Sequence, residues 1–239
     1  MESLEAGLRE AIAAYEEGDK EGPFLVAQQV PWAVYDAWMD GLECHWRLQY
    51  KEGDVWMHGD PSIVHETVSQ WFNTHIISQI CTLPGVDECL DVITPAGASR
   101  LPTVTGDKEP DQCYFSNSDM ARARAVVEVA YRNETIETLR EVVETWEQSG
   151  CKVVIGVKVT SDCQFTFLAK EEGSRDMREI MFGPEFCKTS EGFVIKFPMA
   201  HFTGDVKGDY HIEFDLFKLQ QFIIKMMDQE LSARMAGAV

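Results

Sequence analysis

A single β-branched run limits what this chain can fold into. Residues 125–130 read Ala-Val-Val-Glu-Val-Ala, which predicts a buried strand with one acidic residue, Glu128, at its centre. Asp111 lies 17 positions earlier, directly after Pro110 and just before another short apolar segment. If the two segments form adjacent strands, an α/β sheet brings both carboxylates to one point. We therefore expect the chain to fold around this acidic pair.

Two converging carboxylates predict a divalent metal site. Mg²⁺ and Mn²⁺ prefer oxygen ligands, and such an ion readies water for attack on a phosphodiester. Glu128 needs a partner in any case, because an isolated carboxylate is costly to bury. A structural salt bridge to Arg122 or Arg124 would meet that need equally well. Asp111 after a proline would also suit an ordinary turn.

Hydrophobic periodicity predicts helices and strands on both sides of the acidic pair. Helices are expected at 3–17, 31–41 and 61–80, from an N-cap at Asn133 through Trp146 to Gly150, and from Leu216 onward. Strands are expected at 46–50, 55–57, 89–93, 112–115, 125–130, 151–159, 164–168, 179–182, 193–197 and 210–214, with irregular connections over 82–110. Strand, helix and strand follow one another over 125–159, which implies a right-handed crossover and a parallel pair.

These elements predict an α/β fold class, with a mixed sheet flanked by helices. A length of 239 residues suggests a single domain, 1–239. Within it, we expect an N-terminal helical elaboration at 1–30, a core at 31–160, and a β-rich extension with a terminal helix at 161–239. Trp71 and Trp146 fall on the apolar stripes of their helices, so both rings are expected to be buried between helix and sheet.

The charge balance restricts the partners. Lys and Arg number 21 against 40 for Asp and Glu, a net charge of −19. Because phosphate contacts dominate nucleic-acid affinity, so acidic a chain needs a local basic groove to bind a nucleic acid. The residues that would form this groove are Arg122, Arg124, Arg132 and Lys152. Most of the excess negative charge is interpreted as a solvated, solubilising surface.

Other features set the expected environment. The chain has no apolar stretch long enough for a membrane span, and its acidic N-terminus lacks the layout of a secretion signal. Seven cysteines without CxxC pairs are typical of free, mostly buried thiols in a reducing compartment. We therefore expect an intracellular protein, cytoplasmic or nuclear, that does not associate with a membrane.

Several short motifs together resemble a known group of proteins. They are the polar hairpin with Gly53 at its turn, Pro61-Ser62 followed by His65, Pro110-Asp111 and Val127-Glu128-Val129. In this order they resemble the Uma2-like branch of the PD-(D/E)XK, or restriction-endonuclease-like, superfamily. The Val-Val-Glu-Val-Ala run, the helix ending at Trp146 and the strand at 152–159 resemble fungal and oomycete members in particular. The resemblance spans about residues 31–160 and implies a restriction-endonuclease-like core.

The resemblance also implies roles for individual residues. Asp111 would be the central ligand of Mg²⁺ or Mn²⁺, Glu128 the second ligand, and the Val129 carbonyl the third. His65 would stand beside them on the first core helix, as a member of the catalytic site. Considered alone, a histidine on a helix that buries aliphatic residues is more often a hydrogen-bonded core residue.

The chain departs from the family pattern at three positions. Gln49 stands where the hairpin often carries a glutamate. Ala130 stands where the superfamily's usual motif has a lysine, and Val142 stands where Uma2-like proteins place it instead. Arg140 is the helical cation nearest to that position and is the expected substitute. An arginine keeps its charge and cannot act as a base near neutral pH.

Two functions remain open from the sequence. The first is a Mg²⁺- or Mn²⁺-dependent endonuclease that cleaves phosphodiesters in a nucleic acid. The second is a catalytically inactive nuclease-like fold that serves as an interaction or regulatory, effector-like module, with a protein partner or a second copy of itself. The retained Asp111 and Glu128 favour the first function. Gln49, the missing lysine and the negative charge favour the second.

Overall fold

The computed structural model describes residues 2–17, 23–42, 46–59, 62–86, 91–131, 134–204, 206 and 208–235. The chain divides into two compact units, one made of Met1–Pro61 with Arg100–Glu109 and the other of Ser62–Ser99 with Pro110–Val239. Each unit has its own cluster of buried apolar side chains. The single domain and its subdivision at residues 30 and 160 stay predictions.

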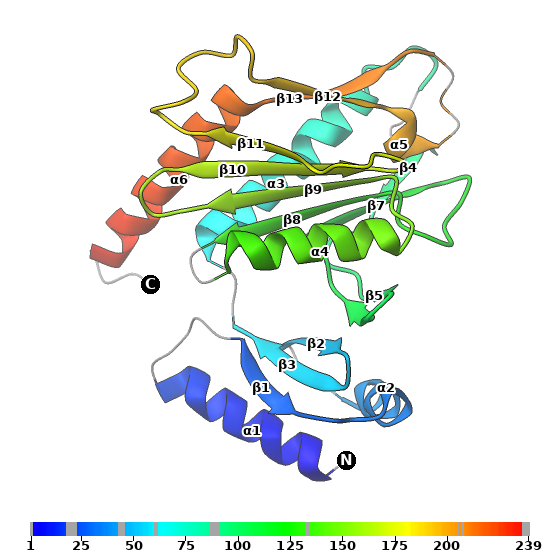
Figure 1. Cartoon of the computed structure of the whole chain (residues 1–239), viewed down its shortest axis with the longest axis vertical. Helices are drawn as coiled ribbons and strands as arrows, with labels where there is room; N and C mark the ends of the chain where they lie inside the picture. The colour runs from blue at the N-terminus through cyan, green and yellow to red at the C-terminus, as the bar shows by residue number, and fades with distance from the viewer. Residues whose placement is uncertain are drawn as a thin grey trace. The chain divides into compact units, whose positions relative to one another are not determined.

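The first unit is an antiparallel sheet with two helices. Its elements are α1 (Glu2–Glu17), β1 (Phe24–Ala27), α2 (Trp32–Asp40), β2 (Arg47–Lys51), β3 (Asp54–His58), β5 (Leu101–Thr103) and β6 (Gly106–Lys108). The strand order is β1-β3-β2-β6-β5, and Figure 1 shows β3 between β1 and β2. Both predicted helices and the β2–β3 hairpin are confirmed. Glu52 and Gly53 both have positive φ (52° and 95°), the backbone that a tight two-residue hairpin turn requires.

Three strands of this unit were not expected from the sequence. β1 is four residues long, and β5 and β6 are three residues each. β5 and β6 fall inside the segment expected to be irregular, where proline and glycine obscure any alternation. β1 and β5 are the edge strands of the sheet, where pairing on one side is enough and the residue pattern is weak.

The second unit is built on a six-stranded mixed sheet with the order β11-β10-β9-β8-β7-β4. Its strands are β4 (Ile93–Pro95), β7 (Gln112–Ser116), β8 (Ala125–Tyr131), β9 (Val153–Val159), β10 (Phe165–Glu171) and β11 (Arg178–Phe182). β8 and β9 pair in parallel, as predicted, with α4 (Ile136–Gln148) between them in the chain. The other pairs in the described sheet are antiparallel.

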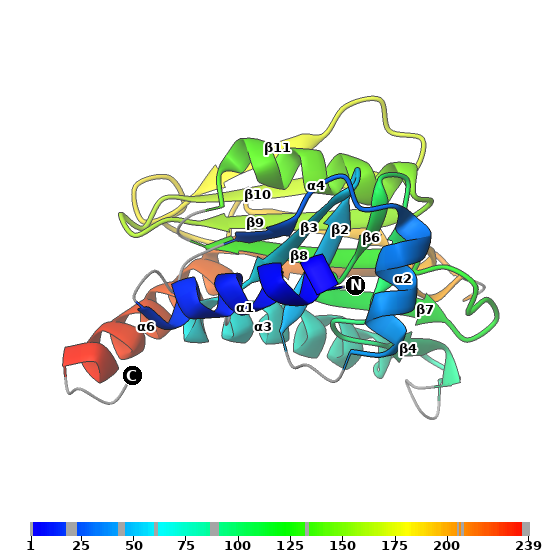
Figure 2. The ribbon, with the colours of Figure 1, turned by 90° about the horizontal axis from the view of Figure 1, so that it is seen from below.

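Helices cover both faces of this sheet. Figure 2 shows α4 on one side of β8, β9 and β10, and α3 (Ile63–Ile80) on the other. α6 (Leu216–Met235) packs against α3. Val127 and Val129 of β8 belong to the core under α3, so the residues between them face α4. Gly156 of β9 admits α4 closely, because a Cβ there would lie 3.0 Å from Val143 Cγ2.

The remaining elements extend the unit. β10 and β11 join the main sheet, whereas β12 (Val194–Pro198) and β13 (His211–Asp215) form a separate antiparallel ribbon near the short helix α5 (Ala200–Thr203). The Trp71 and Trp146 rings are both buried, as predicted.

Two boundaries differ from the sequence-based prediction. The N-cap of α4 is Thr135, whose hydroxyl accepts from the Thr138 N–H, and not Asn133, which lies outside the described residues. Residues 89 and 90 of the strand expected at 89–93 lie outside them too, and the strand β4 begins only at Ile93. A nearby Thr can cap as well as Asn, so composition alone leaves such a start ambiguous by a few residues. None of the described helices is both long and apolar enough to span a membrane.

The packing of α4 on the sheet generates a stability prediction. Leu139 is buried against the position of Gly156, so Leu139→Ala should lower the free energy of unfolding by about 2–5 kcal/mol. Leu231→Ala, on an exposed face of α6, is the matched control and should change it by less than about 0.5 kcal/mol. Urea denaturation of both variants measures the difference. Equal effects would mean that α4 does not pack as described.

Candidate functional site

Asp111 is held by groups from two elements, β8 and α3. It lies directly before β7, and its carboxylate is buried with 3% of the side chain exposed. Its Oδ2 accepts a hydrogen bond from the Val129 N–H at 2.6 Å, and His65 Nε2 lies 3.1 Å from the same oxygen. Its backbone carbonyl accepts from Ser69 Oγ at 3.4 Å. The carboxylate is thus anchored between β8 and α3, so Asp111 is more than a turn residue.

Strand register explains why Asp111 reaches β8. Gln112 pairs with Val127 and Cys113 with Val126, so Asp111 lies next to Glu128 along the ladder. Within a strand, the N–H and C=O of one residue point toward the same neighbour. Since the Val129 N–H bonds to Asp111, the Val129 carbonyl also points to the side of Asp111. The register therefore brings the backbones of Asp111, Glu128 and Val129 into one stretch of the β7–β8 pair, while the Asp111 carboxylate lies toward α3 and the Glu128 carboxylate toward α4.

The carboxylate of Glu128 has a different environment. Glu128 faces α4 and is 4% exposed, and its Oε1 accepts a hydrogen bond from Trp146 Nε1 at 2.5 Å. A charge-assisted bond of this kind stabilises a buried carboxylate. Arg124, one of the two arginines considered as its partner, instead donates from Nη2 to the Ala200 carbonyl at 2.8 Å. The indole of Trp146 was not anticipated as a partner for Glu128.

His65 lies in the first turn of α3 and is buried. The hydroxyl of Ser62 caps this helix by accepting a hydrogen bond from the His65 N–H at 3.1 Å. The cap fixes where the helix begins and therefore places His65 in its first turn. A proton on Nε2 lets the ring donate to Asp111, and His65 Nδ1 lies 3.4 Å from Glu66 Oε1. The structure thus pairs His65 with Asp111, an arrangement that orients the carboxylate.

Arg140 is not brought to the acidic pair. Its Nη2 and Nε donate to the carboxylate of Glu179 at 2.8 and 3.1 Å, and the pair is partly exposed. Glu179 belongs to β11, which is separated from β8 by β9 and β10. The bidentate pair raises the pKa of Arg140. Distance along the sequence placed Arg140 one turn into α4 but did not reveal which strand that turn faces, and its catalytic role stays a prediction.

Gln49 belongs to the first unit, where its Oε1 lies 3.0 Å from His58 Nε2 across the β2–β3 hairpin.

The residues predicted to form a basic groove are partly engaged by other groups. Lys152 pairs with Glu172, Arg124 bonds to a backbone carbonyl, and Arg132 lies outside the described residues.

Lys158 is a buried cation that the sequence analysis did not single out. It lies in the apolar strand β9 and is 7% exposed. Burial lowers the pKa of its amine, while the nearby carboxylate of Glu134 opposes that shift. The sequence carries a signal for it, because Lys158 is a lone charge in a valine-rich strand, as Glu128 is in β8.

The thiols near Glu128 are buried and unreactive. Burial raises the pKa of Cys113 to about 11 and that of Cys151 to about 12. Cys81, Cys113, Cys151, Cys163 and Cys187 are free, as expected. Across the described part of the chain, no three His, Cys, Asp or Glu side chains come close enough to hold a metal ion together.

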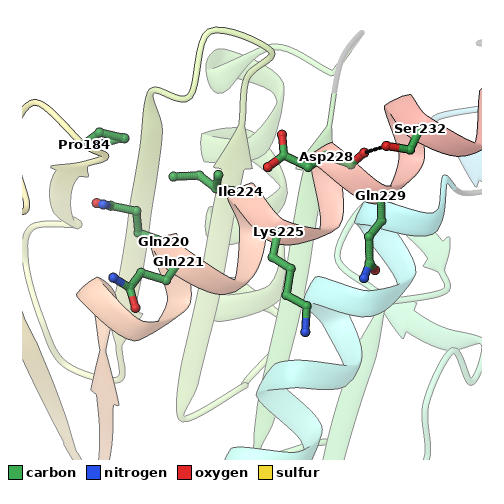
Figure 3. A pocket seen from close by; sticks show the side chains of 8 residues that line it. All are labelled: Pro184, Gln220, Gln221, Ile224, Lys225, Asp228, Gln229 and Ser232. Atoms are coloured by element: carbon green, nitrogen blue, oxygen red, sulfur yellow. Dashed lines mark hydrogen bonds between the residues drawn. The ribbon is translucent and has the colours of Figure 1, made fainter. Parts of the chain in front are cut away.

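A cavity of about 660 Å³ lies elsewhere, along α6. Figure 3 shows side chains of α6 around it, among them Gln220, Lys225 and Asp228, together with Pro184. None of the residues that line it belongs to the predicted site. The volume falls within the range of small-molecule sites, but the acidic pair is not among its walls.

Neither a protein-family model nor a curated protein matches this sequence. Among solved structures, the chain is similar to one described as a "putative nuclease belonging to DUF820" from Anabaena variabilis. The TM-score is 0.52 at 14% sequence identity, over 77% of this chain and 97% of that one. An identity this low shows a shared fold alone. The predicted α/β fold class, with a restriction-endonuclease-like core, is thereby confirmed.

The Trp146–Glu128 hydrogen bond can be tested separately from ring packing. Trp146→Phe keeps an aromatic ring but removes the N–H donor, leaving a buried carboxylate oxygen without it. We expect a loss of about 1–3 kcal/mol in the free energy of unfolding. Trp71→Phe in α3 is the matched control, and it should lose less than Trp146→Phe. An equal loss in the two variants would show that packing, and not the hydrogen bond, explains the effect.

Proposed function

We propose that this protein hydrolyses phosphodiester bonds in a nucleic acid, using a divalent cation held by Asp111, Glu128 and the Val129 carbonyl. The observation that carries the proposal is the buried Asp111 carboxylate, fixed by the Val129 N–H and adjacent to Glu128 in the β7–β8 register. The similarity in fold to a protein described as a nuclease supports the same function.

The residues present suit a hard cation. Two carboxylates and a backbone carbonyl supply only oxygen donors, the ligands that Mg²⁺ and Mn²⁺ prefer. Mg²⁺ commonly uses one or two carboxylates and completes its shell with water and substrate phosphate. A cluster of three acidic or histidine side chains is therefore not required. When bound, the cation would lower the pKa of a water and offset charge on the phosphate.

The chain's own groups prepare this site. The Val129 N–H and His65 both engage Oδ2 of Asp111, which fixes the orientation of that carboxylate. The indole of Trp146 does the same for Glu128. Because these donors are fixed before a substrate arrives, little reorganisation is needed during the reaction.

Metal binding tests the proposal directly. Calorimetry with Mn²⁺ should detect one site, and both Asp111→Asn and Glu128→Gln should weaken binding by more than about tenfold, since loss of even an outer-shell partner costs about 10–100-fold. Glu137→Gln, at an exposed position in the first turn of α4, is the control and should bind as the wild type does. Unchanged binding in the two site variants would reject the metal site.

Cleavage of a mixed panel of DNA and RNA substrates tests the reaction. The wild type should cut with Mg²⁺ or Mn²⁺ and not with a chelator, and the two site variants should be inactive. Robust cleavage by Asp111→Ala would place the chemistry elsewhere in the molecule.

A second function is favoured by one observation. The Glu128 carboxylate already has a structural hydrogen bond to Trp146, in a chain of net charge −19. A fold that keeps the acidic pair for stability alone would serve as an interaction module, with a protein partner or a second copy of the chain. It would then be inert with every metal and substrate, and light scattering or a pull-down would reveal the partner.

A further inference from the structure

The cavity along α6 contains a buried amide that the described part of the protein leaves unsatisfied. Gln220 lies on the wall of this cavity, and only 5% of the residue is exposed. Its Oε1 is buried and has no hydrogen-bond partner among the described residues. An unpaired buried amide oxygen destabilises a fold, and most buried polar atoms in proteins are paired. Gln220 therefore calls for an explanation other than packing.

The cavity follows one row of side chains on α6. Gln220, Ile224 and Asp228 are four residues apart and so lie one above the other along the helix. Figure 3 shows Gln220 and Ile224 extending to the side on which Pro184 lies, whereas Lys225 extends to another side. With a rise of about 1.5 Å per residue, the row is about 12 Å long. It has an amide at one end, a carboxylate at the other and an apolar side chain between them.

The helix that forms one wall is held in place by the fold. Leu219 and Ile223 of α6 are fully buried in the main core of the second unit. Near the other end of the helix, Glu230 is buried, and its Oε2 accepts a hydrogen bond from the Tyr131 hydroxyl at 3.1 Å. The row of side chains therefore stands on a fixed support.

The opposite wall, at Pro184, is fixed by a tight turn. The Gly183 carbonyl accepts hydrogen bonds from the Phe186 and Cys187 N–H groups at 2.9 and 2.8 Å. Gly183 has a φ of 141°, and a Cβ there would lie 2.5 Å from the Cys163 carbonyl oxygen. Only glycine allows this close approach to the β9–β10 connection. A cavity between two fixed walls is typical of small-molecule sites, which usually form before the ligand arrives.

The chemistry of the walls restricts the ligand. Gln220 Oε1 requires an N–H or O–H donor, and an ionised Asp228 also accepts hydrogen bonds only. A ligand that fills the row therefore carries donors at both ends. Ile224 and Pro184 provide apolar surface for its middle. The Asp228 carboxylate and the net charge of −19 disfavour an anionic ligand.

We infer that this cavity binds an adenine ribonucleoside, with the base at Gln220 and the ribose hydroxyls at Asp228. A glutamine amide donates and accepts at once, which matches the adjacent donor and acceptor on the edge of adenine. The amide turns readily about its last torsion, so either polar atom can face the base. A carboxylate that accepts from a ribose hydroxyl is also how dinucleotide-binding folds hold their sugar. Ile224 and Pro184 pack against the base.

Calorimetry of the full chain with adenosine tests the contact to the base. The wild type should bind adenosine at one site and bind purine riboside, which lacks the amino group, about tenfold more weakly. Gln220→Met keeps the length of the side chain without the amide, so it should bind both ligands equally weakly. Lys218→Met, on an exposed part of α6 outside the cavity, is the control and should bind as the wild type does. Equal affinity of the wild type for the two ligands would overturn the inference.

A second pair of ligands tests the contact to the sugar. The wild type should bind 2′-deoxyadenosine about tenfold more weakly than adenosine, because a hydrogen bond to a charged group is lost. In Asp228→Asn this difference should shrink. Adenosine 5′-monophosphate distinguishes a nucleoside from a nucleotide as the ligand, and it should bind no more tightly than adenosine. Tighter binding of the monophosphate would contradict the assignment of an uncharged ligand.

Urea denaturation without ligand separates a binding role of Gln220 from a structural one. Gln220→Met removes a buried atom that has no partner in the described protein, so the urea midpoint should stay the same or rise. A lower midpoint with unchanged adenosine binding would show that the amide serves the fold, which overturns the inference. If Gln220→Met does not fold, Asp228→Asn at its exposed position still provides the test.

The site is independent of the proposed hydrolysis. The described residues that line the cavity include neither Asp111 nor Glu128. Weaker adenosine binding in Gln220→Met with unchanged Mn²⁺ binding supports the inference. A wild type that does not bind adenosine in calorimetry would overturn this site alone and leave the nuclease proposal as it stands.

Discussion

The burial of β8 on both faces is the constraint on which the rest of the second unit depends. A strand covered by α3 on one side and α4 on the other has no solvent-facing residues in its centre, so every side chain must find a partner within the protein. The odd-numbered valines meet this requirement by packing under α3. Glu128 meets it through the indole of Trp146. The backbone N–H of Val129 lies beyond the last regular β7–β8 pair, and it donates a hydrogen bond to the Asp111 carboxylate.

The same constraint links stability to function. A carboxylate that needs a buried donor is fixed in position, and a fixed oxygen can either serve as a metal ligand or simply satisfy its neighbours. Asp111 and Glu128 each accept a hydrogen bond from the protein. The nuclease proposal requires that the same two carboxylates also bind a cation. The interaction-module alternative requires no ligand at either of them.

Much of the fold could be predicted because the strongest signals are local. The stripes of α1 and α3, the turn at Glu52–Gly53 and the run at 125–130 each reflect a few neighbouring residues. The acidic pair could also be identified, since an acid in a valine-rich strand calls for a partner. The three-residue strands β5 and β6 could not, because they depend on pairing with distant segments.

Side-chain partners were harder to predict than elements. Arg140 was placed on the correct helix, but its partner Glu179 is 39 residues later in the sequence and on another strand. Trp146 was correctly predicted to be buried, yet its N–H was not matched to Glu128, because which residues of α4 lie over β8 depends on the crossing of helix and sheet. Lys158 was overlooked inside a strand assigned from its valines. Long-range geometry of this kind is not encoded in spacing along the chain.

The most direct test of the central claim is a crystal structure of the protein grown with Mn²⁺, whose anomalous scattering locates the ion independently of the protein model. The account predicts one peak at a little over 2 Å from a carboxylate oxygen of Asp111, one of Glu128, and the Val129 carbonyl oxygen. A peak elsewhere, or none at a Mn²⁺ concentration that saturates binding in solution, would contradict it.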